Sequence, residues 1–256
     1  MLKNVVLLCL LGLCGNAVAA EAAVAPSAGP AVTPAAVQMV QKAIHRLAAN
    51  VDVDSIRPAP MPGFYQVIAA GQMVYVSTDG KYMMHGDLVD LGRRENLSDA
   101  AWAAFRKDEL AKVPVSQRIV FAPARPKYTV TVFTDVSCGF CRALHAHMAA
   151  FNKAGIAVEY LAWPREGVLT TAGRPTPTYA EMVSVWCAKD RKAAFTAAEQ
   201  GQAPAAASCV NPVKDQYELG LKLGVNGTPT IYGADGRVLG GFVTPEQLLK
   251  ALEEGR

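Results

Sequence analysis

The sequence predicts a chain of two parts, with a small α+β unit followed by a larger mixed α/β unit. Residues 35–97 contain a stretch with helical spacing of apolar residues and then short strand-like runs broken by Pro and Gly. Beyond residue 118, β-branched strands alternate with helical stretches, which is typical of α/β architecture. We therefore expect a small unit over 35–97, a linker helix within 98–117 and a second unit over 118–256.

The first 20 residues predict a secretory signal peptide. Lys3 is the positive start, residues 5–13 form an apolar stretch too short to span a bilayer, and residues 17–19 form an Ala-Val-Ala cleavage pattern. We expect residues 21–34, rich in Ala and Pro, to form a flexible leader of the exported chain. Loss of Lys3 changes the formal charge from +3 to +2, which does not suggest a nucleic-acid partner. After cleavage, no later stretch has the length of a membrane-spanning helix.

Within the small unit, Val37, Val40 and Ile44 recur at helical spacing. The strands predicted after this helix are residues 65–69, 73–77, 81–86 and 87–91, with a hairpin turn at Asp79-Gly80. A sheet this small exposes edge strands, and pairing them with a second copy of the chain is one way to cover them. Because the unit carries no cysteine and no cluster of carboxylates or histidines, we expect it to serve in docking or dimerisation.

The linker helix is predicted over residues 98–113. Ser98 is the expected N-cap, Ala101 and Phe105 lie toward one face, and Pro114 ends the helix. A helix in this position would act as a semi-rigid arm between the two units.

The second unit is expected to combine strands and helices in a fixed order. The strands are predicted at 119–121, 128–134 and 156–161, followed by a hairpin over 231–242 that turns at Asp235-Gly236. The helices are predicted at 138–154, over much of 175–200, at 214–223 and from Pro245. Gly155 is the expected cap at the C-terminal end of the first helix, and Thr244 with Gln247 predicts a capping box before the last.

The residues most suited to chemistry are the two cysteines Cys138 and Cys141. The strand over 128–134 runs into a short turn, and a helix begins at the two cysteines. A Cys-x-x-Cys at the start of a helix that follows a strand is the sequence form of a thioredoxin-like redox site. Because free N–H groups at a helix N-terminus favour negative charge, Cys138 is the predicted nucleophile and the more acidic thiol. Cys141, one turn further along, is placed to close or open a disulfide with it.

A zinc site and a structural disulfide are the alternatives for this motif. His145 lies four residues after Cys141 on the same helical face, His147 is close by, and zinc accepts mixed sulfur and nitrogen ligands. The strand-then-helix context and the predicted export favour redox chemistry that needs no metal and no cofactor. On that interpretation His145 is a helix residue near the site and His147 is a solvated one.

A second signal is Thr228-Pro229, just before the last hairpin. A thioredoxin-like fold places a Thr-Pro turn with a cis peptide bond against the Cys-x-x-Cys, and cis bonds are almost confined to proline. Pro229 lacks an N–H and leaves room for a substrate chain beside the sulfurs, while Thr228 offers backbone hydrogen bonds to it. An ordinary trans turn is the alternative. The order of motif, turn, strand, hairpin and helix favours the cis turn.

The chain has six cysteines, two of which would leave with the signal peptide. The remaining four, an even number in an exported chain, fit two disulfides. Cys138 and Cys141 pair most simply with each other, which would leave Cys187 with Cys209 around an Ala-rich segment. The sequence alone leaves three connectivities open.

The sequence resembles the DsbC family of periplasmic disulfide isomerases and its relative DsbG, over nearly the whole mature chain. The most specific matching stretches are residues 55–60, 133–135 with 138–141, 186–190 and 224–229. The resemblance implies a V-shaped homodimer, in which an N-terminal cystatin-like domain pairs the subunits and a linker helix leads to a thioredoxin-like domain with a helical insertion. It also implies that Cys187 and Cys209 form a structural disulfide.

The resemblance further implies which residues act in the site. The catalytic pair would be Cys138 with Cys141, and substrate would be bound by Gly139, Phe140, Thr228 and Pro229. Phe140 stands where the family typically has Tyr, so the apolar bulk is kept and a hydroxyl is lost. Gly139 favours the isomerase branch over the Pro-containing DsbG type. The implied partners are misoxidised exported proteins and a membrane electron donor of the DsbD type.

The leading hypothesis is a periplasmic thiol:disulfide interchange protein that isomerises wrong disulfides in exported proteins, with chaperone activity. The enzymatic alternatives are a dithiol oxidase or reductase, and a DsbG-like holdase that reduces single exported cysteines. A further alternative from another class is a holdase whose cysteines are merely structural. The predicted dimerisation unit favours isomerisation, because two sites facing a shared cleft would hold an unfolded chain.

Overall fold

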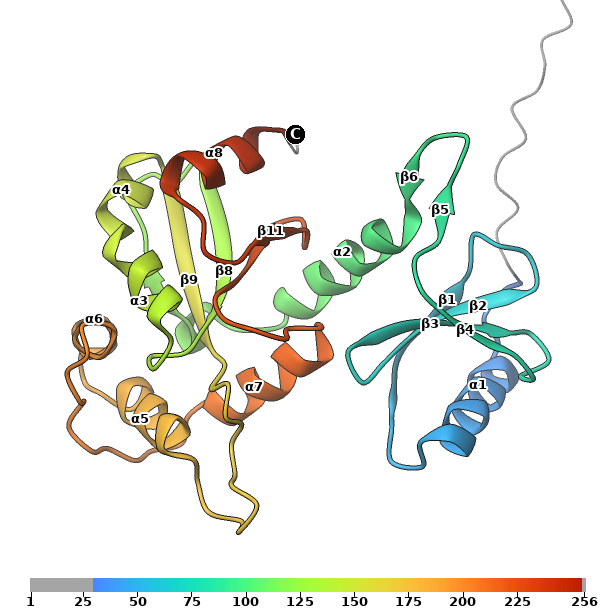
Figure 1. The fold of residues 1–256 in the computed structure, drawn as a ribbon, viewed down its shortest axis with the longest axis horizontal. Coiled ribbons are helices and arrows are strands. Elements are labelled where there is room, and N and C mark those ends of the chain that lie inside the picture. Colours follow the sequence, from blue (N-terminus) through green and yellow to red (C-terminus); the bar gives the residue numbers. More distant parts are fainter. Residues whose placement is uncertain (1–29, 255–256) are drawn as a thin grey trace, which may run out of the picture.

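The computed structural model describes residues 30–254, which form two units joined by helix α2 (Leu97–Leu110) (Figure 1). The N-terminal unit and the larger α/β unit lie at opposite ends of an elongated molecule. The predicted signal peptide and most of the predicted leader lie outside the described residues. Within residues 30–254, no helix is both long enough and apolar enough to cross a bilayer.

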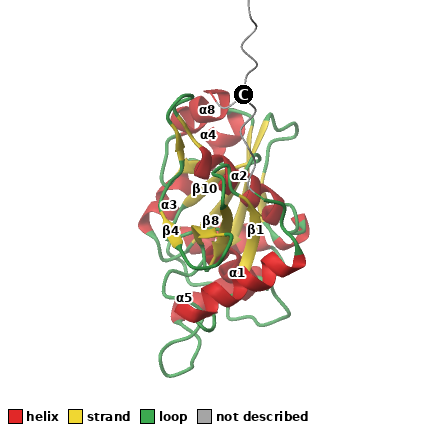
Figure 2. Cartoon of the chain, turned by 90° about the vertical axis from the view of Figure 1, so that its right-hand side faces the viewer, coloured by secondary structure: helices red, strands yellow, loops and turns green. Residues whose placement is uncertain are grey.

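The N-terminal unit is one helix on a four-stranded antiparallel sheet. Helix α1 (Pro34–Leu47) crosses one face of the sheet (Figure 2). Thr33 caps α1 by accepting a hydrogen bond from the Ala36 N–H at 3.2 Å, and Val40 and Ile44 are buried against the sheet. The strands, in their spatial order, are β1 (Val53–Pro58), β2 (Phe64–Ala69), β3 (Gln72–Ser77) and β4 (Met83–His85).

The two central strands of this sheet are buried on both faces. Alternate residues such as Val67 and Val74 pack under α1, while Ile68 and Tyr75 face the other way and join a core shared with the α/β unit. A Cβ at Gly71, in the β2–β3 turn, would overlap the Leu221 carbonyl oxygen of the α/β unit. Glycine therefore allows this turn to dock directly against the second unit.

The predicted strands over 81–91 are shorter than expected and belong to two sheets. β4 pairs with β3, whereas β5 (Val89–Asp90) pairs with β6 (Glu95–Asn96) in a separate hairpin. The turn at Asp79-Gly80 is confirmed. The Asp79 carboxylate accepts hydrogen bonds from the Ser77 hydroxyl and the Lys81 N–H, and Gly80 has a φ of 67°.

Ser98 is not the N-cap of α2, so that prediction is wrong. The Asn96 side chain caps the helix by accepting from the N–H groups of Ser98 and Asp99 at 3.0 and 3.3 Å. The buried Ser98 hydroxyl instead bonds Tyr75 at 2.7 Å and the Leu88 N–H at 2.8 Å. It thereby ties the start of α2 to the N-terminal sheet.

The α/β unit is built on a five-stranded sheet. Its strands, in spatial order, are β11 (Val238–Gly240), β10 (Thr230–Gly233), β8 (Tyr128–Thr134), β9 (Ile156–Ala162) and β7 (Ile119–Phe121). β8 and β9 are parallel, and the other pairs are antiparallel. The helices are α3 (Gly139–Ala146), α4 (Met148–Lys153), α5 (Pro177–Trp186), α6 (Arg191–Glu199), α7 (Val213–Lys222) and α8 (Pro245–Glu254).

Two predicted helices are divided in the structure. The helix expected over 138–154 is interrupted at His147, because the His147 N–H bonds the carbonyl of Leu144 in a tighter turn. The helical stretch expected over 175–200 breaks before Asp190, which caps α6 by accepting from the Ala193 N–H at 3.0 Å. The capping box at Thr244 and Gln247 is confirmed, with both reciprocal hydrogen bonds present.

Apolar residues cover both faces of the five-stranded sheet. One face packs under α3, α4, α5, α6 and α8, with Trp186 and Phe195 at the centre of this core. The other face packs against α7, α2 and the N-terminal sheet, so Phe133 and Leu223 share a core with Tyr75. Burial on both faces explains why β9 is a nearly continuous apolar run, interrupted by Glu159.

Helix α2, which the sequence predicts as a semi-rigid arm, packs against both units. The Arg106 guanidinium lies over the rings of Trp102 and Tyr232, at 4.7 and 5.1 Å, and its Nε donates to the Leu223 carbonyl at 3.1 Å. Lys222 on α7 forms ion pairs with Asp54 and Glu109. These contacts fix the orientation of the α/β unit relative to the N-terminal sheet.

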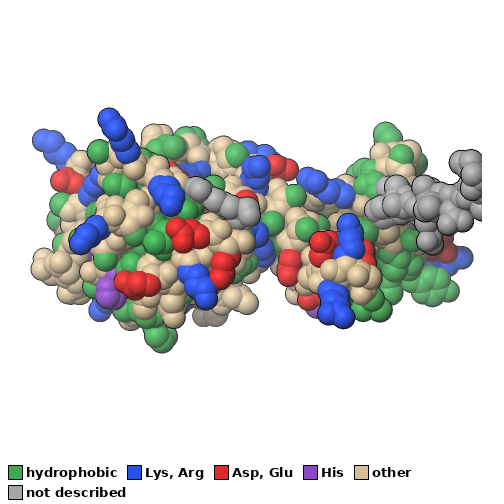
Figure 3. Space-filling view, turned by 90° about the horizontal axis from the view of Figure 1, so that it is seen from above, with side chains coloured by type: hydrophobic (Ala, Val, Ile, Leu, Met, Phe, Trp, Pro, Cys, Tyr) green, Lys and Arg blue, Asp and Glu red, His purple; other side chains and the backbone are tan. Residues whose placement is uncertain are grey.

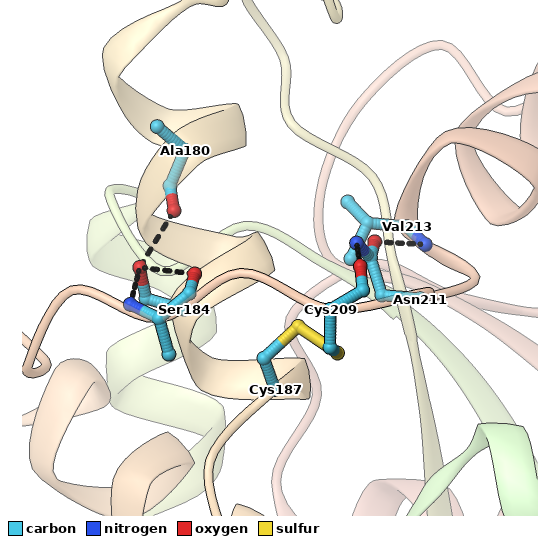
Figure 4. Close-up of a disulfide and its surroundings, with 7 residues drawn as sticks. Ala180, Ser184, Cys187, Cys209, Asn211 and Val213 are labelled. Carbon is cyan, nitrogen blue, oxygen red and sulfur yellow. Dashed lines mark hydrogen bonds between the residues drawn. A yellow bond between two sulfur atoms is a disulfide. The ribbon is translucent and has the colours of Figure 1, made fainter.

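The structure contains the disulfide Cys187–Cys209, the pairing that the family resemblance implies (Figure 4). Cys187 ends α5, and Cys209 lies in the connection that leads to α7. The Asn211 side chain donates to the Cys209 carbonyl and accepts from the Val213 N–H, so the connection enters α7 in a defined conformation. The disulfide therefore closes a loop that contains all of α6.

Replacing both Cys187 and Cys209 by Ser is expected to lower the free energy of unfolding by about 3 kcal/mol. The two residues are 22 positions apart, and opening such a loop restores entropy to the unfolded chain. Denaturant unfolding of the double variant and the wild type would measure the difference. Unchanged midpoints would show that the bond adds no stability.

Candidate active site

Cys138 and Cys141 lie where a strand meets a helix, at the carboxyl edge of the central sheet. β8 ends at Thr134, a turn follows, and Cys138 is the N-cap of α3 in an extended conformation. Cys141 lies in the first turn of α3 and is buried. Both cysteines are free thiols in this structure. The arrangement gives one sulfur at the helix N-terminus and a second directly behind it.

A buried carboxylate holds the turn before Cys138. Asp135 is fully buried, and its Oδ1 accepts hydrogen bonds from the Ser137 N–H at 2.7 Å and the Ser137 hydroxyl at 2.6 Å. Its Oδ2 accepts from the Arg165 N–H at 2.8 Å and from Arg165 Nε at 3.2 Å. Arg165 is not among the site residues that the sequence predicts. Its position just beyond β9 was the available signal, since the carboxyl ends of neighbouring parallel strands lie side by side.

The Thr228–Pro229 peptide bond is cis, as predicted. The antiparallel pairing of β10 with β8 brings Thr230 opposite Phe133 and so carries the preceding turn to the cysteines. The Cys138 thiol donates a hydrogen bond to the Thr228 carbonyl at 3.2 Å. The two signals that lie 90 residues apart in the sequence therefore meet at one sulfur atom.

The pKa of Cys138 lies below its ordinary value. Burial raises the pKa, but hydrogen bonds to the thiolate from the Thr228 side chain and from the N–H groups of Cys141 and Phe140 outweigh that effect. Within the described residues the buried Thr228 hydroxyl has no partner in the thiol form, so it is free to donate when the sulfur ionises. The environment therefore favours the thiolate of Cys138.

The pKa of Cys141 is raised to about 12, chiefly by burial. Hydrogen bonds from the Thr134 hydroxyl and from the Asp135 backbone lower this pKa, and a negative charge on Cys138 raises it further. The pKa of Cys138 is therefore lower than that of Cys141, as the sequence predicts for a nucleophile followed by a resolving cysteine.

Alkylation of the reduced protein at neutral pH is expected to label Cys138 and to leave Cys141 unmodified. The lowered pKa of Cys138 makes a larger share of it thiolate than in an ordinary cysteine, whereas the buried Cys141, with a pKa of about 12, stays protonated. Peptide mass mapping over a pH series would give both titrations. Faster labelling of Cys141 would contradict the assignment of the two sulfurs.

The surface around Cys138 is apolar although the sulfur itself is nearly covered. Cys138 is 2% exposed, whereas Phe140 is 66% exposed and Phe242 is 40% exposed. The two phenylalanine rings lie 6.2 Å apart, and a Cβ at the exposed Gly139 would meet open space. Phe242 is not among the site residues that the sequence predicts. Its place directly after the hairpin next to the Thr228 turn was the signal for it.

His145 is part of the core and not a group facing the two cysteines. Its ring nitrogens lie 3.2 Å from the Tyr160 hydroxyl and 3.0 Å from the Thr196 hydroxyl, and burial lowers its pKa to about 4. His147 is exposed. Residues 30–254 contain no group of three His, Cys, Asp or Glu side chains arranged to hold a metal ion.

Each of the two units matches a known protein family. Residues 15–99 match the model of the disulfide bond isomerase protein N-terminal domain, and residues 115–256 match that of a thioredoxin-like domain. The thiol:disulfide interchange protein DsbC of Escherichia coli is 34% identical over 215 residues, which cover 83% of this chain and 87% of that protein. The chain belongs to the DsbC family.

Two other family members show the same extent of similarity. The DsbC protein of Haemophilus influenzae is 36% identical, and the alignment covers 80% of this chain and 86% of that protein. The DsbC protein of Salmonella typhimurium is 35% identical, with 83% and 86% covered. The chain is accordingly a thiol–disulfide oxidoreductase of the disulfide isomerase family, with the family's N-terminal domain and a thioredoxin-like C-terminal domain.

Proposed function

We propose that this DsbC-family protein isomerises wrong disulfides in exported proteins in the periplasm, with Cys138 and Cys141 as the catalytic pair. The observation that carries the proposal is the contact between the Cys138 thiol and the carbonyl of Thr228, beside the cis peptide bond to Pro229. It combines an acidic thiol at a helix N-terminus with an irregular backbone segment against which a substrate chain can lie. Cys141 is held behind the first sulfur as the resolving group.

The reaction begins when the Cys138 thiolate attacks a substrate disulfide and forms a mixed disulfide. One substrate sulfur leaves as a thiolate. A second substrate thiolate then attacks the substrate sulfur of the mixed disulfide, which forms the new substrate bond and releases the Cys138 thiolate. If no substrate thiol attacks, Cys141 attacks Cys138 instead and the substrate leaves reduced. The oxidised pair then needs electrons, which we assign to a membrane donor of the DsbD type.

Gly139, Phe140, Thr228 and Pro229 are the proposed substrate contacts. The exposed ring of Phe140 offers an apolar surface for an unfolded chain, and Gly139 leaves open space above the helix terminus. The backbone of Thr228 supports hydrogen bonds along an extended peptide. Phe242 extends the same apolar surface. Contacts of this kind suit many sequences, as repair of varied substrates requires.

We further propose a homodimer that forms through the N-terminal domain over 35–97, with residues 98–117 leading to the catalytic domain over 118–256. β4 is an edge strand of the N-terminal sheet, and Tyr82, Met83 and Met84 on or beside it are exposed. Hydrophobic side chains gather at this end of the molecule (Figure 3). Edge strands with exposed apolar residues are suited to pairing with another chain. Two sites facing a shared cleft would also give chaperone activity.

Two assays run side by side test the proposed function. Refolding of scrambled ribonuclease reports isomerisation, and insulin reduction reports simple dithiol chemistry. The wild type is expected to be active in the first assay with catalytic amounts of protein. Insulin reduction without ribonuclease refolding would favour a reductase and would contradict the proposal.

Replacing Met83 and Met84 together by Glu is expected to give a monomer that still reduces insulin but loses most ribonuclease refolding. Adjacent charges on both chains of a paired edge repel each other and must lose water on pairing. Light scattering gives the mass of each variant. Val238→Glu places one such charge on an exposed residue of β11, at the edge of the other sheet, and is the control for a charge on an edge strand. A dimer that persists in the double variant would rule out this edge as the interface.

A further inference from the structure

One buried carboxyl group close to the cysteines has no part in the exchange steps above. Glu199, the last residue of α6, is 4% exposed. Its Oε1 accepts a hydrogen bond from the Thr134 hydroxyl at 3.2 Å. Within residues 30–254 its buried Oε2 has no hydrogen-bond partner. Since a half-satisfied buried carboxylate is costly, this group takes up a proton more readily than an exposed carboxylate would.

The Thr134 hydroxyl connects Glu199 to the resolving thiol. Thr134 is the last residue of β8 and is fully buried. The same side chain also lowers the pKa of Cys141, because it is placed to donate a hydrogen bond to the thiolate of that residue. A hydroxyl has one proton to donate and two lone pairs that accept, so it is able to serve both neighbours in turn.

We propose that Glu199 accepts the proton of Cys141 through the Thr134 hydroxyl when Cys141 attacks the mixed disulfide on Cys138. The proposal rests on the proposed function, because it concerns the resolving step of that reaction. Cys141 needs such an acceptor, since a thiol with a pKa of about 12 is almost entirely protonated at neutral pH. Bulk water does not have direct access to this thiol, which is 1% exposed.

The thiol proton of Cys141 passes to Thr134 Oγ1 while the hydroxyl proton of Thr134 passes to Glu199 Oε1. The Cys141 sulfur forms a bond with the Cys138 sulfur, and the bond from Cys138 to the substrate sulfur breaks. The substrate sulfur leaves with the electron pair as a thiolate. The cysteine pair is oxidised, the substrate is reduced, and the proton remains on Glu199.

The charge on Cys138 determines at which stage of the reaction Glu199 can accept a proton. Burial raises the pKa of Glu199 to about 8, the bond from Thr134 lowers it, and a negative charge on Cys138 raises it. In the mixed disulfide Cys138 carries no charge, so Glu199 loses its proton more readily at the stage when Cys141 needs a base. The charged or titratable groups acting on Glu199 from the neighbouring elements are Cys138 and Arg142 at α3, Asp135 after β8 and Tyr160 on β9.

Glu199→Gln tests the proposal with a coloured aromatic disulfide reagent added to the reduced full-length protein. The first equivalent of coloured thiolate reports attack by Cys138, and the second reports attack by Cys141. Gln keeps an oxygen that accepts from Thr134 but cannot take a proton. We expect the second phase to slow by about 100-fold at neutral pH and the first phase to change little. The dependence of the second phase on Glu199 ionisation should also disappear from the pH–rate profile.

Two further variants separate this role from a structural one. Glu181→Gln removes a half-buried carboxyl on α5 that also interacts with Arg142 and Asp135, and it should leave both phases unchanged. Thr134→Val keeps the shape of the side chain and removes the hydroxyl, so it should slow the second phase as Glu199→Gln does. An unchanged second phase in both Glu199→Gln and Thr134→Val would overturn the relay. Loss of the first phase in the wild type would instead refute the proposed function.

Unfolding measurements show whether Glu199 titrates as the proposal requires. Its folded pKa is raised above that of the unfolded chain, so its contribution to stability is present at acid pH and is lost as pH rises through about 8. Glu199→Gln lacks this loss, and its melting temperature relative to the wild type should rise between pH 5 and pH 9. A constant difference over this range would contradict a buried, titrating carboxyl group.

Discussion

Cys138→Ala is expected to abolish refolding of scrambled ribonuclease and to prevent any mixed disulfide with substrate. The Cys138 sulfur is the acidic thiol at the α3 N-terminus, and the remaining Cys141 is buried with a pKa of about 12. A thiol that is neither ionised nor accessible cannot start the exchange at neutral pH. Non-reducing mass spectrometry of the variant with a disulfide-containing substrate would test for the covalent complex.

Cys141→Ala is the matched variant, because it removes a sulfur from the same motif without touching the nucleophile. It should retain part of the isomerisation and accumulate mixed disulfides, since the resolving attack is lost while a second substrate thiol is still able to release Cys138. Equal loss of activity in the two variants would contradict this division of roles. Trapping of substrate on Cys141 in the Cys138→Ala variant would show that Cys141 is the nucleophile instead.

Asp135→Asn is expected to lower the free energy of unfolding by about 3 kcal/mol and to slow labelling of Cys138. Asn keeps the oxygen that accepts from Ser137. Its NH₂ group, however, would face the Arg165 N–H and Nε, which in the wild type donate to Oδ2 of Asp135. Unsatisfied buried donors are costly, and the turn that precedes Cys138 loses its fixed position. Denaturant unfolding and alkylation kinetics would measure the two effects.

Asp90→Asn is the control for this change. Asp90 accepts from the N–H groups of Gly92 and Arg93 and from Arg93 Nε, so its hydrogen-bond pattern resembles that of Asp135. Its side chain is 30% exposed, whereas that of Asp135 is fully buried. Water can replace the lost bonds at Asp90, and its unfolding midpoint should hardly change. Similar losses at both positions would show that burial is not the cause.

Local sequence signals predicted much of the secondary structure. The β-branched run over 128–134 and the capping box at Thr244 depend on interactions between residues close in sequence, and the structure contains both. Boundaries that depend on distant partners were less accurate. Ser98 was the predicted N-cap of α2, but its hydroxyl is engaged with Tyr75 in another element, and Asn96 caps the helix instead.

The sequence also predicted those residues of the candidate site that belong to recurring motifs. Cys138, Cys141 and the cis bond before Pro229 belong to short patterns with a known physical role. Arg165 and Phe242 carry no such pattern, because each is an ordinary residue in its own segment. They join the site through the parallel pairing of β8 with β9 and the hairpin of β10 with β11.

The sequence by itself determined the family, the thiol pair and the order of helices and strands in the α/β unit, whereas strand β1 of the N-terminal sheet was not predicted. The tertiary structure decided which groups surround the sulfurs and how the two units contact each other. Burial raises the pKa of both Glu199 and Cys141, and it arises from the packing of α6 against β8 and α3, which are far apart from α6 in the chain. The packing of α2 between the units likewise depends on a core that neither unit contains alone. Burial is a property of the folded environment, so a side chain acquires it only when distant segments close around it.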